Sequence, residues 1–161
     1  MKVNITLYAT LAALALAGCE QFPGVVNDAK REVRRNLIDP SSAEFESVYQ
    51  NSNTGAVCGL VNAKNRMGAY VGATPFVYEE GSGATLVHEP PRERDFERYF
   101  EMIRYSEASD YLALEDQCRA AALWQEKCES SIYPITNKYC LLVIEGKSML
   151  EVYEAAKHNL K

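Results

Sequence analysis

The chain has 161 residues, of which 47% are hydrophobic and 10% aromatic, and its 22 acidic and 17 basic residues give a formal net charge of −5. The apolar content is sufficient for a packed core, which excludes a globally disordered chain. The mild acidity argues against nucleic acid and anionic lipid surfaces as main partners, because both are bound by clustered lysine and arginine. The length corresponds to one ordinary domain.

The sequence begins with Met1 and a basic residue, Lys2, followed by a short apolar run over 3–17. A membrane-spanning helix needs about 20 apolar residues, and this run is shorter. A basic start, a short apolar middle and small residues at the end are typical of a secretory signal peptide, which is removed from the mature protein. We therefore expect residues 1–18 to be a signal peptide.

The end of this run, Leu-Ala-Gly-Cys at 16–19, resembles the lipobox of bacterial lipoproteins. The resemblance implies that Cys19 carries lipid as the first mature residue and begins a tether over 19–24. The second mature position is Glu20 and not the aspartate associated with inner-membrane retention. The resemblance therefore implies the outer membrane, with the domain facing the periplasm. An uncleaved membrane helix, or an ordinary signal peptide with a chance cysteine, remains the alternative.

With Cys19 assigned to lipid, four of the five cysteines remain in an exported chain. An even set in an oxidising compartment predicts two disulfides. Zinc is the weaker alternative, because no Cys-x-x-Cys pair occurs and both histidines are far from any cysteine in sequence, so we predict neither a metal nor a cofactor. The predicted disulfide residues are Cys58, Cys118, Cys128 and Cys140.

The first predicted element is an amphipathic helix, because apolar residues recur at helical spacing from Val25 to Leu37. It ends at Asp39, since the residue before a proline avoids the helical conformation. Pro75 cannot donate to a neighbouring strand, so we expect its strand to be at a sheet edge or bulged. Strands are predicted over 45–49, 56–64, 69–78 and 84–88.

The second half predicts helices over 92–105 and 108–128, a last apolar strand over 139–144, and a terminal helix after Gly146. The predicted fold class is α+β, with a small, mainly antiparallel sheet, amphipathic helices packed on one face, and two disulfides. Residues 25–161 are assigned to a single domain with this fold.

Helix geometry limits the disulfide pairing. Cys118 and Cys128 lie ten residues apart on one predicted helix, about 15 Å along its axis. A disulfide requires α-carbons within about 7 Å, so these two cysteines are not expected to pair. We favour Cys58–Cys118, tying sheet to helix, with Cys128–Cys140, closing the helix end onto the last strand. The swapped pairing stays open.

Three interior motifs are distinctive: Asp-Pro-Ser-Ser-Ala-Glu-Phe at 39–45, Cys-Gly-Leu-Val-Asn-Ala-Lys-Asn at 58–65, and Gly-Ala-Tyr-Val-Gly from 68, followed by Phe76. In this order they resemble motifs of a group of small, poorly characterised exported bacterial proteins. The resemblance covers about residues 33–78 and implies no particular activity.

Four polar residues of these motifs, Asn62, Lys64, Asn65 and Tyr70, are expected to cluster around one hairpin. The functional interpretation is a recognition patch for a peptide, glycan or protein. The alternative interpretation is that the asparagines satisfy backbone groups at turns and strand ends, which is their ordinary use.

The sequence favours a protein without enzymatic activity. His88 and His158 form no nucleophile–base set, and no Gly-x-Ser-x-Gly, His-Glu-x-x-His or phosphate-binding glycine loop occurs. We predict an accessory lipoprotein, held to the membrane by lipid on Cys19, that binds envelope or periplasmic proteins. One alternative is an immunity or inhibitor lipoprotein that neutralises a periplasmic toxin or cell-wall hydrolase, because an acidic surface attracts a basic enzyme. The other is a small envelope enzyme of unknown reaction.

Overall fold

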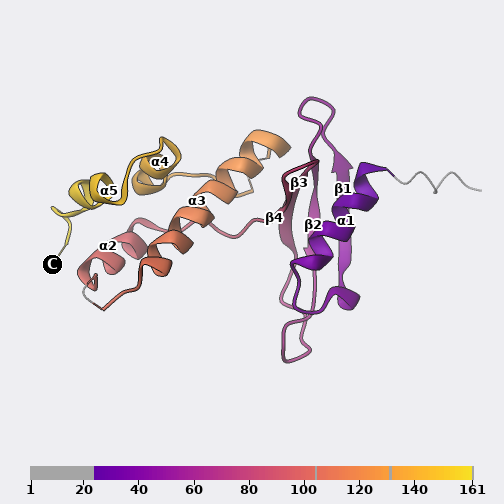
Figure 1. Ribbon diagram of the computed structural model, residues 1–161, viewed down its shortest axis with the longest axis horizontal. Helices are drawn as coiled ribbons and strands as arrows, with labels where there is room; N and C mark the ends of the chain where they lie inside the picture. Colours follow the sequence, from indigo (N-terminus) through magenta and orange to yellow (C-terminus); the bar gives the residue numbers. More distant parts are fainter. Residues whose placement is uncertain (1–23, 104, 131, 161) are drawn as a thin grey trace, which may run out of the picture.

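The computed structural model describes residues 24–103, 105–130 and 132–160. The predicted signal peptide, Cys19 and most of the tether lie outside these residues. The described chain is α+β, as predicted, with a four-stranded antiparallel sheet, helices and two disulfides (Figure 1). The sheet and the first helix form one half of the molecule, and four helices extend from it as the other half (Figure 1).

The sheet is a succession of hairpins in the order β1-β2-β3-β4. β1 carries a bulge between Glu46 and Tyr49, where Ser47 has a φ of +50°. A bulge at an edge strand discourages pairing with other chains. The strands are β1 (Glu44–Gln50), β2 (Val57–Asn62), β3 (Thr74–Glu79) and β4 (Gly83–Leu86).

Pro75 lies in β3, an interior strand, so the prediction of an edge position is wrong. The Pro75 carbonyl accepts a hydrogen bond of 2.8 Å from the N–H of Val87, which lies just past the end of β4. The N–H that proline lacks therefore falls where the β3–β4 ladder stops, and no interior bond is lost. β3 also begins at Thr74, later than the predicted start at 69.

Helix α1 (Val25–Arg35) covers one face of the sheet. Its inner residues Ala29 and Val33 are fully buried, and Arg31 and Arg35 on its outer side pair with Asp28 and Glu32. Side chains alternate between the two faces of a strand, so every second residue of β2 meets α1. The sheet residues buried in this core are Val57, Val61, Phe76 and Tyr78.

Helix α3 (Ala108–Cys128) brings its last turns to the opposite face. Trp124 and Cys128 pack there against Cys58, Val77 and Val87. The sheet therefore has helices on both faces, where the sequence analysis placed them on one. The reason is that β2 and β3 are buried on both sides, as continuous apolar strands require.

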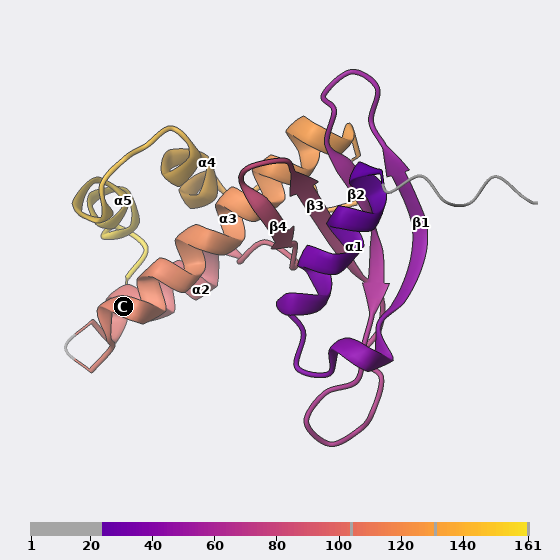
Figure 2. The same ribbon diagram turned by 45° about the vertical axis from the view of Figure 1, so that its right-hand side comes forward.

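The rest of α3 belongs to a second, helical core. Helices α2 (Glu93–Glu101), α4 (Lys138–Ile144) and α5 (Met149–Ala156) pack around it. Figure 2 shows α3 running from these helices to the sheet, so that one helix serves both halves. The core is largely aromatic and includes Phe96, Tyr99, Phe100, Tyr111 and Tyr139.

Residues 138–144 form helix α4, so the predicted last strand is wrong. Asn137 caps this helix, because its Oδ1 accepts a bond of 2.8 Å from the N–H of Tyr139. Its Nδ2 donates at 2.8 Å to the carbonyl of Pro91, and Gly146 beyond the helix has a φ of +82°. Asparagine before and glycine after an apolar run are helix start and stop signals. A run of six apolar residues, 139–144, does not by its periodicity distinguish a helix from a strand.

The four cysteines form two disulfides as predicted, but the favoured pairing is wrong. The bonds are Cys58–Cys128 and Cys118–Cys140, with α-carbons 5.9 and 5.2 Å apart. The error follows from α4: because Cys140 lies on a helix of the second core, it faces the middle of α3 and meets Cys118. Cys128, at the end of α3, lies above β2 and pairs there with Cys58.

The last turn of α3 is also hydrogen-bonded to the β1–β2 hairpin. Asn51 Nδ2 and Thr54 Oγ1 each donate at 2.8 Å to the carbonyl of Lys127, and the Tyr49 hydroxyl donates at 3.0 Å to that of Cys128. The final carbonyls of a helix have no hydrogen-bond partner within the helix, and these bonds supply partners for two of them. The Lys127 ammonium lies 3.0 Å from a Glu79 carboxylate oxygen, which adds an ion pair to the junction.

The two disulfides differ in the loop they close, which predicts unequal contributions to stability. Cys58–Cys128 spans 70 residues and Cys118–Cys140 spans 22. In the loop-entropy estimate, replacing both cysteines by alanine costs about 4 kcal/mol for the longer loop and about 3 kcal/mol for the shorter. Urea denaturation of the two double variants measures the difference. A larger loss for Cys118→Ala/Cys140→Ala would contradict the loop-entropy estimate, and peptide mapping that finds Cys58 bonded to Cys118 would contradict the structure.

Gly59 is predicted to tolerate no side chain. A Cβ built there lies 2.9 Å from the Phe76 ring and 2.9 Å from Val48 Cγ2, and the Phe76 side chain is fully buried. Gly59→Ala should therefore lower the free energy of unfolding by about 1–3 kcal/mol, the usual cost of overpacking. Urea denaturation tests this, with the exposed hairpin substitution Ser82→Ala as control. Equal midpoints for the two variants would refute the close packing of β2 on β3.

Candidate functional site

The three sequence motifs meet at one end of the sheet. The first motif forms the short 3₁₀ helix η1 (Pro40–Ser42), and the Ser42 hydroxyl oxygen accepts a bond of 2.8 Å from the N–H of Lys64 in the second motif. The third motif is joined to both, since Tyr70 donates at 3.0 Å to Glu44 and the N–H of Gly72 donates at 3.1 Å to Asn62 Oδ1. We call this region, residues 38–44 and 62–72, the motif tip.

The two asparagines of the predicted patch shape the motif tip. The Asn65 side-chain oxygen accepts bonds from the N–H groups of Met67 and Ala69, at 2.9 and 3.1 Å. Asn62 holds Gly72 in the same way. Their side-chain oxygens are thus bound to backbone N–H groups of the β2–β3 loop, which is the alternative interpretation given above.

Lys64 and Tyr70 lie side by side on the motif tip. They form an isolated antiparallel bridge, and the Lys64 ammonium lies 5.3 Å from the centre of the Tyr70 ring. The hydrogen bond to the Glu44 carboxylate, which is strongest with a protonated phenol, raises the pKa of Tyr70. The ring nevertheless remains 44% exposed. The structure therefore brings the four predicted residues together and leaves Tyr70 exposed and Lys64 half-buried beside it.

The motif tip also carries exposed apolar side chains. Met67 is 91% exposed, Val71 64% and Ile38, at the start of the motif tip, 63%. Scattered apolar residues are normal on a protein surface, whereas a contiguous exposed patch marks a contact surface, and these three side chains are candidates for such a patch. The sequence analysis omitted Met67 and Val71 because it considered only the polar residues of the motifs.

Asp39 holds the turn that leads into the motif tip. Its carboxylate accepts bonds from the Ser41 hydroxyl, at 2.6 Å, and the Ser41 N–H, at 3.1 Å. The hydrogen bond from the Ser41 side chain is the main reason why the pKa of Asp39 lies below that of an ordinary aspartate. Lys64 contributes a weaker electrostatic attraction.

The motif tip lies at the opposite end of the sheet from the start of α1. Val25 lines a small hollow with Gln50, Ala56 and Glu79, where β1 and β3 end and β2 begins. β2 leads from there to the motif tip, six residues or about 20 Å away. Figure 2 shows the two at opposite ends of the sheet.

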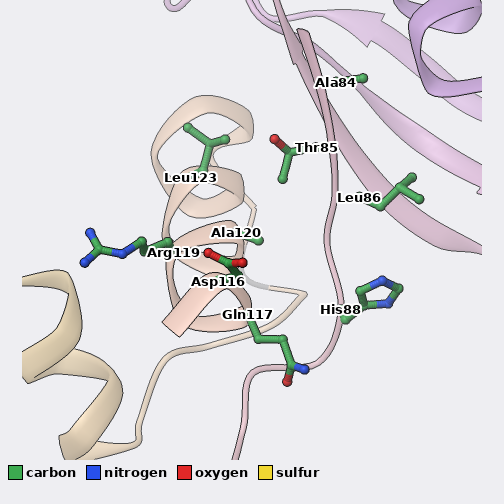
Figure 3. Close-up of a pocket in the computed structure, with 9 residues that line it drawn as sticks. All are labelled: Ala84, Thr85, Leu86, His88, Asp116, Gln117, Arg119, Ala120 and Leu123. Carbon is green, nitrogen blue, oxygen red and sulfur yellow. The ribbon is translucent and has the colours of Figure 1, made fainter. Parts of the chain in front are cut away.

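A groove that the sequence did not predict lies between β4 and α3 (Figure 3). Its volume is about 550 Å³. Thr85 points from β4 toward α3, whereas Ala84 and Leu86 pack with the α1 core (Figure 3). No sequence signal identifies it, because it arises where α3 diverges from the sheet. The other residues that line it are His88, Asp116, Gln117, Arg119, Ala120 and Leu123.

Comparisons of the chain with protein-family models, curated proteins and solved structures find no match. Within the described ranges, no group of three or more histidine, cysteine or acidic side chains is placed to hold a metal ion. None of the helices described is long and apolar enough to cross a membrane. The two disulfides are consistent with an extracytoplasmic, oxidising location.

The turn at Asp39 yields a prediction about acid sensitivity. Because its pKa is lowered on folding, Asp39 stabilises the fold above the pKa of an unfolded aspartate, about 3.9, and this contribution is lost as the pH falls through the lowered value. Ser41→Ala should raise the pKa of Asp39 toward the ordinary value, measured by NMR titration of the side-chain carboxyl carbon. Ser52→Ala, in the hairpin at the other end of the sheet, is the control. An unchanged titration curve in Ser41→Ala would disprove the proposed cause.

Proposed function

We propose that this protein is a non-enzymatic lipoprotein of the bacterial cell envelope, anchored in the outer membrane by lipid on Cys19, that binds a periplasmic or envelope protein through the motif tip. The observation that carries the proposal is the convergence of three motifs on one hydrogen-bonded end of the sheet, where Met67, Tyr70 and Val71 remain exposed. Aromatic and methionine side chains are enriched in protein interfaces, and a backbone fixed by hydrogen bonds loses little freedom on binding.

The position of the motif tip supports this proposal. The tether precedes α1, and α1 begins at the end of the sheet opposite the tip. A chain held by lipid on Cys19 would accordingly present the motif tip away from the membrane surface, toward partners in the periplasm.

A second candidate is an inhibitor or immunity lipoprotein directed at a toxin or cell-wall hydrolase. The net charge of −5 favours it, because an acidic protein attracts a basic enzyme over a distance and speeds their encounter. The two candidates use the same surface and differ in the identity of the bound protein, so one experiment separates them.

The experiment places a photo-crosslinking amino acid at position 67 of the lipidated protein in its native envelope and identifies the products by mass spectrometry. We expect one stoichiometric protein partner. A resident envelope protein assigns an accessory role, and a secreted hydrolase or toxin assigns inhibition. The matched control is the same probe at position 150, where Leu150 is an exposed apolar residue of the helical half.

Two outcomes would refute the proposal. If positions 67 and 150 give the same products, or position 67 gives none, the motif tip is not the binding surface. Cys19→Ser tests the anchor separately, because the variant should be released from the membrane fraction or remain unprocessed. If it stays in the membrane with the mass of the lipidated wild type, lipid is not attached at Cys19.

A further inference from the structure

We infer that the groove between β4 and α3 is a second binding site, which takes an extended peptide segment of a partner protein. The segment adds to β4 as a further strand and places a lysine or arginine side chain against Asp116. This site is separate from the motif tip and is built from other residues.

The first wall of the groove is β4, an edge strand of the sheet. The N–H of Val87 donates to Pro75 in β3, and along an antiparallel strand alternate residues direct their backbone groups to opposite sides. Ala84 and Leu86 therefore direct theirs to the free edge. The bond of 2.9 Å from Asn36 Nδ2 to the carbonyl of Ala84 confirms this direction. The backbone groups of Leu86 are left to receive a peptide, as in other cases of strand addition.

The second wall is α3, which gives the edge a depth that an open sheet lacks. Ala120 and Leu123 lie across from Thr85 and provide an apolar surface (Figure 3). The volume of about 550 Å³ is typical of sites that bury a ligand. Every second side chain of an added strand would point toward α3 and could occupy the groove.

The Asp116 carboxylate gives the groove its preference for a cationic peptide. Asp116 is exposed on α3 and forms no ion pair with any other residue that the structure describes. Arg119 also lines the groove, but its guanidinium points away from β4 (Figure 3), so Asp116 is the charged group left to meet a cationic side chain of the peptide. The net charge of −5 also attracts cationic segments from a distance.

The α3 wall is held in place by two disulfides before any peptide binds. The disulfide Cys58–Cys128 fixes the end of α3 on the sheet, and Cys118–Cys140 fixes its middle to α4. Asp116, Ala120 and Leu123 lie on the part of α3 on either side of Cys118. A preformed groove avoids the cost of ordering its walls on binding, which favours affinity for a short segment.

The test selects binders from a display library of random heptapeptides against the full mature protein with its disulfides intact. We expect selected peptides to share one lysine or arginine among residues that favour strands. Their addition should shift the NMR amide signals of residues 84–88 and 116–123 and leave those of the motif tip unchanged. Asp116→Asn should weaken binding about tenfold, whereas Glu126→Gln, an exposed carboxylate on the same helix outside the groove, should not.

The backbone contribution is tested on the peptide, which leaves the protein unaltered. N-methylation of alternate amides keeps every side chain but removes the donors on one edge, and one of the two possible patterns should abolish binding. The inference is overturned if no cationic peptide is selected, if Asp116→Asn binds as tightly as wild type, or if both N-methylated forms bind unchanged. A concentration-dependent dimer with the same amide shifts would assign the groove to a second copy of the chain and would also overturn it.

Discussion

The attachment of the last turn of α3 to the sheet is the contact on which the rest of the structure depends. α3 is the helix shared by both cores, and it joins the sheet through a disulfide, three hydrogen bonds to the carbonyls of Lys127 and Cys128, and an ion pair with Glu79. A helix end buried without partners would leave its carbonyls unsatisfied, so the β1–β2 hairpin and the helix stabilise each other. The direction of α3 then fixes where the helical half stands and how wide the groove beside β4 is.

Much of the fold could be predicted from the sequence because its patterns are local. Helix α3 matches the predicted range 108–128, and α1 and the four strands lie within or close to the predicted segments. The prediction failed at 139–144, where six residues of apolar sequence fit either a helix or a strand and the capping signal of Asn137 was missed. The disulfide pairing then followed the wrong element, because a cysteine on a sheet strand and one on a helix of the second core meet different partners. The groove could not be predicted, since the angle between α3 and the sheet is set by contacts far apart in sequence.

In the candidate site, too, the local arrangement could be predicted from the sequence, whereas features that depend on contacts far apart in the chain could not. A hairpin that gathers Asn62, Lys64, Asn65 and Tyr70 was expected, and the structure places them together. The sequence did not indicate which of these side chains would remain outward-facing. The exposure of each side chain depends on the backbone N–H groups that bind both asparagines. It also depends on η1, more than twenty residues earlier in the chain, where the Ser42 hydroxyl accepts a hydrogen bond from the N–H of Lys64. The exposed apolar residues of the motif tip, Met67 and Val71, were not indicated, because only its polar residues were considered.

The use of one helix by two cores has a consequence for the order in which the chain folds. The helical half and the sheet are each built from neighbours in sequence, whereas their junction joins residues 58 and 128. Local contacts form faster than distant ones, because a longer loop costs more entropy to close. During oxidation, the bond between Cys118 and Cys140 should therefore close first, while Cys58 and Cys128 still carry free thiols. Closure of this last pair would mark the moment at which both the groove and the orientation of the helical half become fixed.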